Sequence, residues 1–403
     1  FEFPKRTMFI VCGSYEHTLH GYCAFDTVEF FDDDDGERES SGSFQVVQRF
    51  GYSPHIASVR CVSLQYPLLA SGGADESIKV YDVEKLSEVV ELSAHKSSIS
   101  GLAWATSRYL VSACKGGDMK LWRTQDWQEL VQLRGHKKEI LSIAMHPSQR
   151  TFASLSRDKS MRLWDLLSSN CVHKQIVPNG RVIERLVWSK GEEGRFFALI
   201  WRGRKSALDA FTVAVYDAFK GEEIYRFQPE RVILSIVFIQ DHLLAVGGED
   251  KLIRLYQIET SSSQSGSSSS SDDGKSHGSS SDDDRAVASM DNDPLQPKQV
   301  CVLKGHKQRI SAMQSLDALP LDTKYETGPW LVSASTDGVI YVWNMANGKR
   351  VAKMKTNAHI TCIDVAVVKK KVPKKRKSKR KKKSKTTKKQ QKTTKKQYKK
   401  QKK

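Results

Sequence analysis

Five histidines recur along the chain at similar spacings and are the residues best suited to acid–base chemistry. They are His55, His95, His136, His306 and His359, and each precedes a β-branched residue by four positions. Imidazole titrates near neutral pH, so a histidine beside a serine and an acid could activate a nucleophile. Their regular recurrence argues against this, because a catalytic residue has no reason to repeat with a fixed period. We therefore interpret these histidines as structural.

No other motif for catalysis, phosphate binding or metal binding accompanies them. The sequence has no GxxxxGK[ST], HExxH or GxSxG motif and no Cys-x-x-Cys pair. Its seven cysteines are interpreted as reduced thiols on strands. No apolar run approaches the roughly 20 residues that span a bilayer, and there is no signal segment, which argues against membrane and secreted classes. We expect a protein that is not an enzyme and has no cofactor or metal.

The histidines belong to a repeat that ends in an aromatic residue followed by a polar one. The strings LASGGADESIKVYD, LVSACKGGDMKLWR and FASLSRDKSMRLWD align without gaps, and four further copies bring the number of units to seven. Each unit contains four short stretches of alternating apolar residues, separated by Gly, Asp, Ser or Pro, which predicts four strands. Seven units of about 40 residues predict an all-β, seven-bladed WD-repeat β-propeller.

Within a unit, a loop histidine, a strand serine, a turn aspartate and the strand aromatic can form one buried hydrogen-bonded chain. Leaving such groups unpaired would cost roughly 1–3 kcal/mol each, so a complete set stabilises its blade. Three units supply a set: His136, Ser154, Asp158 and Trp164; His306, Ser333, Asp337 and Trp343; and, with a tyrosine as the aromatic, His55, Ser71, Asp75 and Tyr81. Units with Asn179 or Pro229 at the histidine position should be looser.

The two ends of the chain are incomplete units that complement one another. The N-terminal segment contains three strands and lacks the strand that should follow a loop histidine, whereas residues 359–368 are such a strand without a unit. We therefore predict that both ends share one blade and close the ring, which removes open sheet edges. The propeller should occupy residues 1–368, with an acidic loop at 31–40 and a disordered, acidic and Ser-rich insert at 260–298.

Residues 369–403 concentrate the positive charge of the chain. They include 22 Lys or Arg in 35 residues and no acid, whereas residues 1–368 hold 43 bases and 46 acids. This composition predicts a disordered Lys-rich tail that acts as a nuclear localisation signal and binds RNA without base specificity. A tail that only aids nuclear import is the alternative. The residues expected to act are Lys374, Lys375, Arg376, Lys377, Lys379, Arg380, Lys381, Lys382 and Lys383.

The loops on the face that carries the histidines are the expected partner surface of such a ring. The run from Trp201 to Lys205 places a tryptophan beside three cations, a combination favoured at interaction hot spots. An ordinary basic loop after a strand that ends at Trp201 is the alternative. The candidate residues are Lys115, Lys137, Lys138, Arg157, Trp201, Arg202, Arg204 and Lys205.

Four stretches of the sequence resemble the PAK-interacting WD-repeat proteins: GSYEHTLHGY (13–22), HPSQRTFASLSRDKSMRLWDL (146–166), LVWS (186–189) and TNAHITCIDV (356–365). The resemblance implies a nucleolar, non-catalytic scaffold in assembly of the large (60S) ribosomal subunit and pre-rRNA processing. Its partners would be pre-60S proteins and ribosomal RNA, with no membrane. The resemblance also implies an alternative, a signalling adaptor that binds and restrains a p21-activated kinase. A chromatin-binding propeller is a third interpretation, because fold alone does not fix the partner.

Overall fold

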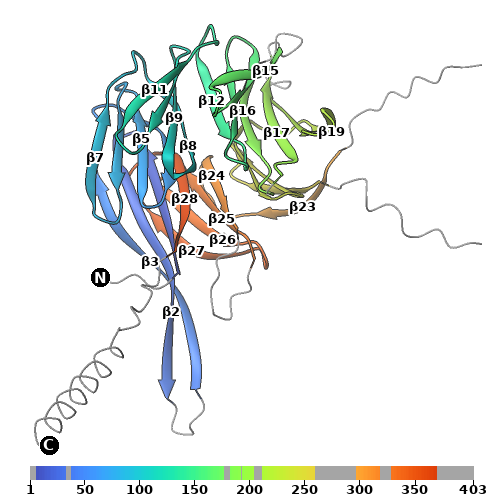
Figure 1. Ribbon diagram of the computed structural model, residues 1–403. Coiled ribbons are helices and arrows are strands. Elements are labelled where there is room, and N and C mark those ends of the chain that lie inside the picture. Colours follow the sequence, from blue (N-terminus) through green and yellow to red (C-terminus); the bar gives the residue numbers. More distant parts are fainter. Residues whose placement is uncertain are drawn as a thin grey trace, which may run out of the picture. The chain divides into compact units, whose positions relative to one another are not determined.

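The computed structural model describes residues 6–32, 38–176, 182–191, 193–203, 211–258, 296–317 and 328–369. These residues form seven four-stranded sheets (Figure 1). Within these ranges the only helical element is the 3-10 turn Thr106–Arg108, and no helix there is long and apolar enough to cross a membrane. The prediction of an all-β, seven-bladed propeller is confirmed.

Six blades each use four strands that follow one another in the chain. The first three are β4 (Val59–Gln65), β5 (Leu68–Gly73), β6 (Ile78–Asp82) and β7 (Ser87–Leu92); β8 (Ile99–Ala105), β9 (Tyr109–Cys114), β10 (Met119–Arg123) and β11 (Gln128–Leu133); and β12 (Ile140–Met145), β13 (Thr151–Ser156), β14 (Ser160–Asp165) and β15 (Asn170–Ile176). The next three are β16 (Val182–Trp188), β17 (Phe196–Arg202), β18 (Phe211–Asp217) and β19 (Glu222–Phe227); β20 (Ile233–Gln240), β21 (Leu243–Gly248), β22 (Ile253–Gln257) and β23 (Lys298–Leu303); and β24 (Ile310–Leu316), β25 (Trp330–Ser335), β26 (Val339–Asn344) and β27 (Lys349–Lys355).

The seventh blade joins both ends of the chain. Its strand order is β28 (Ile360–Lys369), β1 (Arg6–Ser14), β2 (Leu19–Asp32) and β3 (Arg38–Tyr52). The Tyr15 amide donates to the His359 carbonyl at 2.9 Å. A Cβ at Gly13 would lie 2.6 Å from Val59 Cγ1 and 2.8 Å from Cys362 Sγ, so this seam needs glycine there. The predicted closure of the ring by the terminal strands is confirmed.

The β2–β3 hairpin is longer than the sequence suggested. Asp32 pairs with Arg38, so the ladder includes half of the expected acidic loop 31–40, and residues 33–37 connect the strands. The prediction of a loop was therefore wrong at both of its ends, because continued antiparallel pairing satisfies the backbone groups of these residues. Figure 1 shows this hairpin projecting from its blade.

The interiors of the two other unusual segments lie outside the described residues. The Ser-rich insert 260–298 falls between β22 and β23, which are the third and fourth strands of their blade, and β23 already begins at Lys298. Residues 370–403, with most of the predicted tail, are also outside the described part of the chain. Phe1–Val368 form one compact unit.

Apolar side chains fill the spaces between neighbouring blades. The second strand of a blade is buried on both faces: Phe9 and Ile10 of β1 and Leu331 and Val332 of β25 are all 0% exposed. This explains why these strands read as continuous apolar runs. The outer strands carry the exposed residues, among them Val89 of β7. The buried sheets hold the surface loops in fixed positions.

Candidate interaction surface

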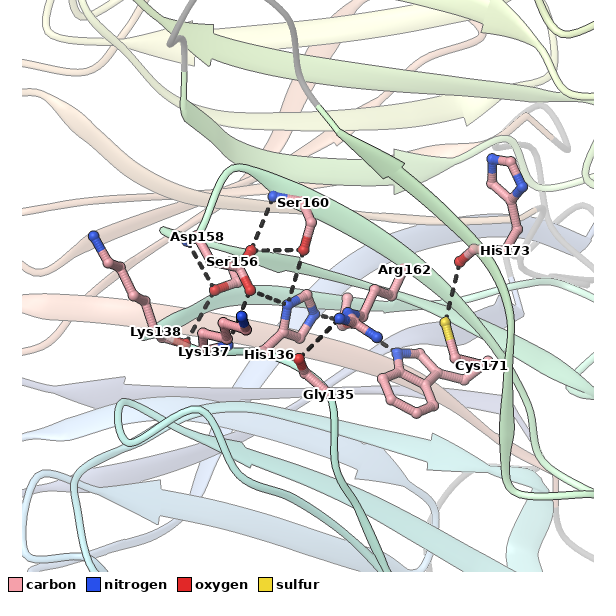
Figure 2. A network of polar contacts seen from close by, with 12 residues as sticks. Gly135, His136, Lys137, Lys138, Ser156, Asp158, Ser160, Arg162, Cys171 and His173 are labelled. Atoms are coloured by element: carbon pink, nitrogen blue, oxygen red, sulfur yellow. Dashed lines mark hydrogen bonds and ion pairs between the residues drawn. The ribbon is translucent and has the colours of Figure 1, made fainter.

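Hydrogen bonds tie the histidine loops to the turns between the second and third strands, so both lie on one face of the ring. In the third blade, Asp158 of the β13–β14 turn accepts from the Lys137 amide at 3.0 Å. His136 Nδ1 lies 3.1 Å from the same carboxylate, and the Ser160 hydroxyl donates to it at 2.6 Å (Figure 2). These hydrogen bonds to Asp158 therefore fix the position of the loop that carries Lys137 and Lys138.

The chain of polar contacts continues inward from His136. Its Nε2 lies 2.6 Å from the Ser154 hydroxyl, which accepts the Trp164 indole N–H at 2.8 Å. Burial lowers the pKa of His136, against the opposing influence of Asp158. The neutral ring thus donates from Nδ1 to Asp158 and accepts at Nε2 from Ser154. All four predicted members of this set are in contact.

The same network lowers the pKa of Asp158. Burial alone would raise its pKa, but hydrogen bonds from Ser160, the Lys137 amide and His136 outweigh burial and hold the pKa below its ordinary value. The carboxylate is therefore ionised at neutral pH. The ionised carboxylate stabilises the loop, and this structural role accounts for its low pKa.

The set around His306 differs from the prediction. His306 Nε2 lies 2.7 Å from the Ser333 hydroxyl, and Trp343 Nε1 donates to that hydroxyl at 2.9 Å. Asp337, however, accepts from Ser335 and from the Val339 amide, and His306 Nδ1 has no hydrogen-bond partner among the described residues. Including Asp337 in this set was wrong. Val339 stands where the third blade has Ser160, so the hydroxyl that helps to position Asp158 is missing here.

The set around His55 reaches only three residues. His55 Nε2 lies 2.8 Å from the Ser71 hydroxyl, and Nδ1 lies 3.1 Å from Asp75. Tyr81 points elsewhere and donates its hydroxyl to Glu88 at 3.2 Å. The prediction that Tyr81 replaces tryptophan in the network was therefore wrong, because a phenol places its donor farther along the ring axis than an indole does.

The second blade contains a set that the sequence analysis missed. His95 Nε2 lies 2.7 Å from the Ser112 hydroxyl, which accepts from Trp122 Nε1 at 2.8 Å. Gly116 occupies the place of the turn aspartate, and its amide donates to the Ser97 hydroxyl at 2.7 Å. The aligned serine and tryptophan of LVSACKGGDMKLW were the signal that could have revealed this set.

The structure brings four of the predicted partner residues together above these networks. Glu139 lies 3.5 Å from Lys115 Nζ and 3.4 Å from Arg157 Nη1, and the Lys137 and Lys138 side chains are exposed beside it. Surface ion pairs of this kind contribute little stability, so these side chains remain available to a partner. We call Lys115, Lys137, Lys138 and Arg157 the basic rim; it carries four positive charges around one central acid.

Trp201 is not part of an exposed hot spot. Strand β17 continues through Arg202, which places Trp201 between blades with only 7% of its surface exposed. The Arg226 guanidinium lies 5.6 Å from its ring centre. Assigning Trp201 to the partner surface was therefore wrong. Arg202 is exposed and pairs with Glu184 at 3.1 Å, whereas Arg204 and Lys205 lie outside the described residues.

Among the described residues, the recurring histidines of four blades take part in structural hydrogen-bond networks. His55, His95, His136 and His306 are held beneath the surface by hydrogen bonds. No three His, Cys, Asp or Glu side chains in the described ranges are grouped as ligands for a metal ion. The arrangement favours recognition through loops.

Comparison with known proteins identifies the repeats and the relatives. The family model described as "WD domain, G-beta repeat" matches residues 45–82, 86–123, 127–165 and 297–344. "p21-activated protein kinase-interacting protein 1-like" of Danio rerio is 25% identical over 88% of this chain and 80% of its own length. "Protein MAK11" of Saccharomyces cerevisiae is 25% identical over 92% of this chain and 87% of its own length. The chain is thus a seven-bladed WD40-repeat protein, homologous to the proteins named p21-activated protein kinase-interacting protein 1 and MAK11.

Proposed function

We propose that this protein is a non-catalytic scaffold in assembly of the large ribosomal subunit, acting in the nucleolus with pre-60S proteins and ribosomal RNA. The observation that carries the proposal is the similarity to MAK11 and its relatives along almost the whole chain. The sequence motifs resemble the PAK-interacting WD-repeat proteins, and that resemblance implies the same role. A ring with buried histidine networks and loops held in place suits docking more than catalysis.

The basic rim and the Lys-rich residues 369–403 would have different roles in this function. The basic rim offers fixed cations to an acidic protein segment or to RNA phosphates. The Lys-rich residues 369–403 would add RNA affinity without base specificity and direct the protein to the nucleus. If the tail neutralises about 8 RNA phosphates, the logarithm of the affinity would fall with a slope of about −6 against the logarithm of salt.

A second candidate is an adaptor that binds and restrains a p21-activated kinase. The names of the Danio rerio and Homo sapiens relatives favour it, since both are called p21-activated protein kinase-interacting proteins. This candidate needs the same rigid ring but no RNA contact. It would leave the tail with a role in nuclear import alone.

Sedimentation of the tagged protein on a sucrose gradient separates the two candidates. If the scaffold proposal is right, the tagged protein should sediment with large-subunit precursors. This association should weaken when Lys137 and Lys138 are changed to glutamate. A chain that lacks residues 369–403 should shift toward the cytoplasm. Recovery only with a kinase in the light fractions, or unchanged nucleolar location without the tail, would contradict the proposal.

A further inference from the structure

The first strands of all seven blades enclose a central cavity of about 290 Å³. Its wall includes residues from β4, β8, β12, β16, β20, β24 and β28. The proposed scaffold function uses the outer loops and leaves this cavity without a role. Its lining is more polar than the spaces between blades and contains two arginines, Arg60 and Arg185.

Arg185 is exceptional among the residues at its level of the ring. In six blades the register of the first strand shifts near its start, and the residue that follows the shift occupies an equivalent position. Arg185 is the large member of this group. The others are small: Cys61, Gly101, Ser142, Ser235 and Ala312. Four of these small residues, Cys61, Gly101, Ser142 and Ala312, line the cavity together with Arg185.

The positive charge of Arg185 has no direct partner. No hydrogen bond or ion pair joins its guanidinium to any other described residue. Glu184, the one acid in the cavity wall, pairs with Arg202 at 3.1 Å. Burial lowers the pKa of Arg185, while Glu184 and the Cys362 thiol act in the opposite direction. An arginine nevertheless stays protonated in proteins, so the cavity holds a cation that has no hydrogen bond or ion pair to another described residue.

A hydroxyl group on a residue that lines the same cavity also has no hydrogen-bond partner among the described residues. Ser100 lines the cavity, and its buried Oγ makes no hydrogen bond to a described residue. Ser142, at the level of Arg185 on the neighbouring blade, lines the same cavity. Buried donors and charges are normally satisfied, and leaving them unsatisfied is costly. A guanidinium and hydroxyls on residues that line one small space are the kinds of donor that an oxyanion requires.

We propose that the central cavity binds a small oxyanion of the phosphate class, held by the Arg185 guanidinium with the Ser100 and Ser142 hydroxyls as further donors. The planar guanidinium offers two parallel N–H groups, which match two oxygens of a phosphate. Since a water occupies about 30 Å³ in the liquid, the cavity has room for one such anion with several waters but not for a helix or a folded segment. The ligand would therefore be a free anion.

Isothermal titration of the full chain with inorganic phosphate, at constant ionic strength in chloride, tests this proposal. Arg185→Met should weaken phosphate binding roughly 10-fold or more, and Ser100→Ala by several-fold. Arg108→Met, at an exposed arginine on the 3-10 turn, is the matched control and should bind like the wild type. Every variant keeps residues 369–403, so phosphate bound by the tail cancels in the comparison.

Thermal unfolding gives a second readout that does not depend on the titration. Arg185→Met removes a charge that has no ion pair to another described residue, so without phosphate it should unfold at a higher temperature than the wild type, and added phosphate should stabilise it less. Equal phosphate effects in the wild type and Arg185→Met would show an adventitious ion only and overturn the proposal. Acetate as effective as phosphate would overturn the assignment to the phosphate class and indicate a carboxylate site.

Discussion

Replacing Ser154 by alanine should destabilise the protein more than the equivalent change at Ser71. The Ser154 hydroxyl serves two buried groups, His136 Nε2 at 2.6 Å and the Trp164 indole N–H at 2.8 Å. Ser154 is 0% exposed and Trp164 is 2% exposed, so water does not replace the lost partner. At roughly 1–3 kcal/mol for each unsatisfied group, Ser154→Ala should lower the free energy of unfolding by roughly 2–6 kcal/mol.

Ser71→Ala is the matched control, because it removes a serine at the equivalent strand position. His55 Nε2 is the only buried side-chain group that depends on that hydroxyl, since Tyr81 donates to Glu88 and the contact from Ser71 to the Lys79 carbonyl is long, at 3.5 Å. The expected loss is therefore about half as large, roughly 1–3 kcal/mol. Urea unfolding monitored by circular dichroism measures both variants, with the midpoint and slope reported together.

A double-mutant cycle with Trp164→Phe isolates the indole contact. Trp164→Phe should cost less in the Ser154→Ala background than in the wild type, because the hydroxyl that accepts the indole N–H is already absent. Equal losses for Ser154→Ala and Ser71→Ala, or additive effects in the cycle, would refute the network as the source of the difference.

Two further predictions concern pH and the closing blade. Burial lowers the pKa of His95 and of His306 to about 4, below the ordinary value of 6.5. As pH decreases from about 6.5 to about 4, the unfolded chain therefore binds protons before the folded chain does, and the free energy of unfolding should fall by about 3 kcal/mol per histidine. Urea unfolding across this pH range should show a shallower loss for His95→Gln. Half-buried Asp364 accepts from the Leu64 amide at 2.7 Å and from Gln314 Nε2 at 2.8 Å. Asp364→Ala should therefore lower the midpoint of thermal unfolding more than Asp364→Asn, and equal midpoints would contradict this role.

Repetition made the ring predictable. The aromatic residue near the end of each unit marks the third strand of a blade, and residues 359–368 had no partner strand except at the other end of the chain. Hydrophobic alternation follows from which face of a strand is buried, and this repeats in every blade. The number of blades and the shared seam could therefore be predicted without coordinates.

Details that depend on one turn or one strand end could not be predicted in the same way. Asp337 and Asp158 align, yet Asp337 does not reach its histidine, because the neighbouring residue is Val339 and not a serine. Trp201 was assigned to a surface because the strand end was placed too early. Arg185 looked like one polar residue in an alternating strand. Its unpaired charge becomes evident only when the registers of neighbouring blades are compared.

Circular permutation tests the closed ring most directly. Because β28 pairs with β1 and Tyr15 contacts His359, Val368 and Thr7 should lie side by side at the other end of these strands. Gln257 pairs with Lys298, so new ends can be opened there. The permutant starts at 296, joins Val368 to Thr7 through a short linker and ends at 258. The reference protein consists of residues 7–368 with the insert 259–295 shortened. The permutant should unfold in one transition, at a midpoint near that of the reference protein. Loss of that transition in the permutant alone would contradict the shared seventh blade.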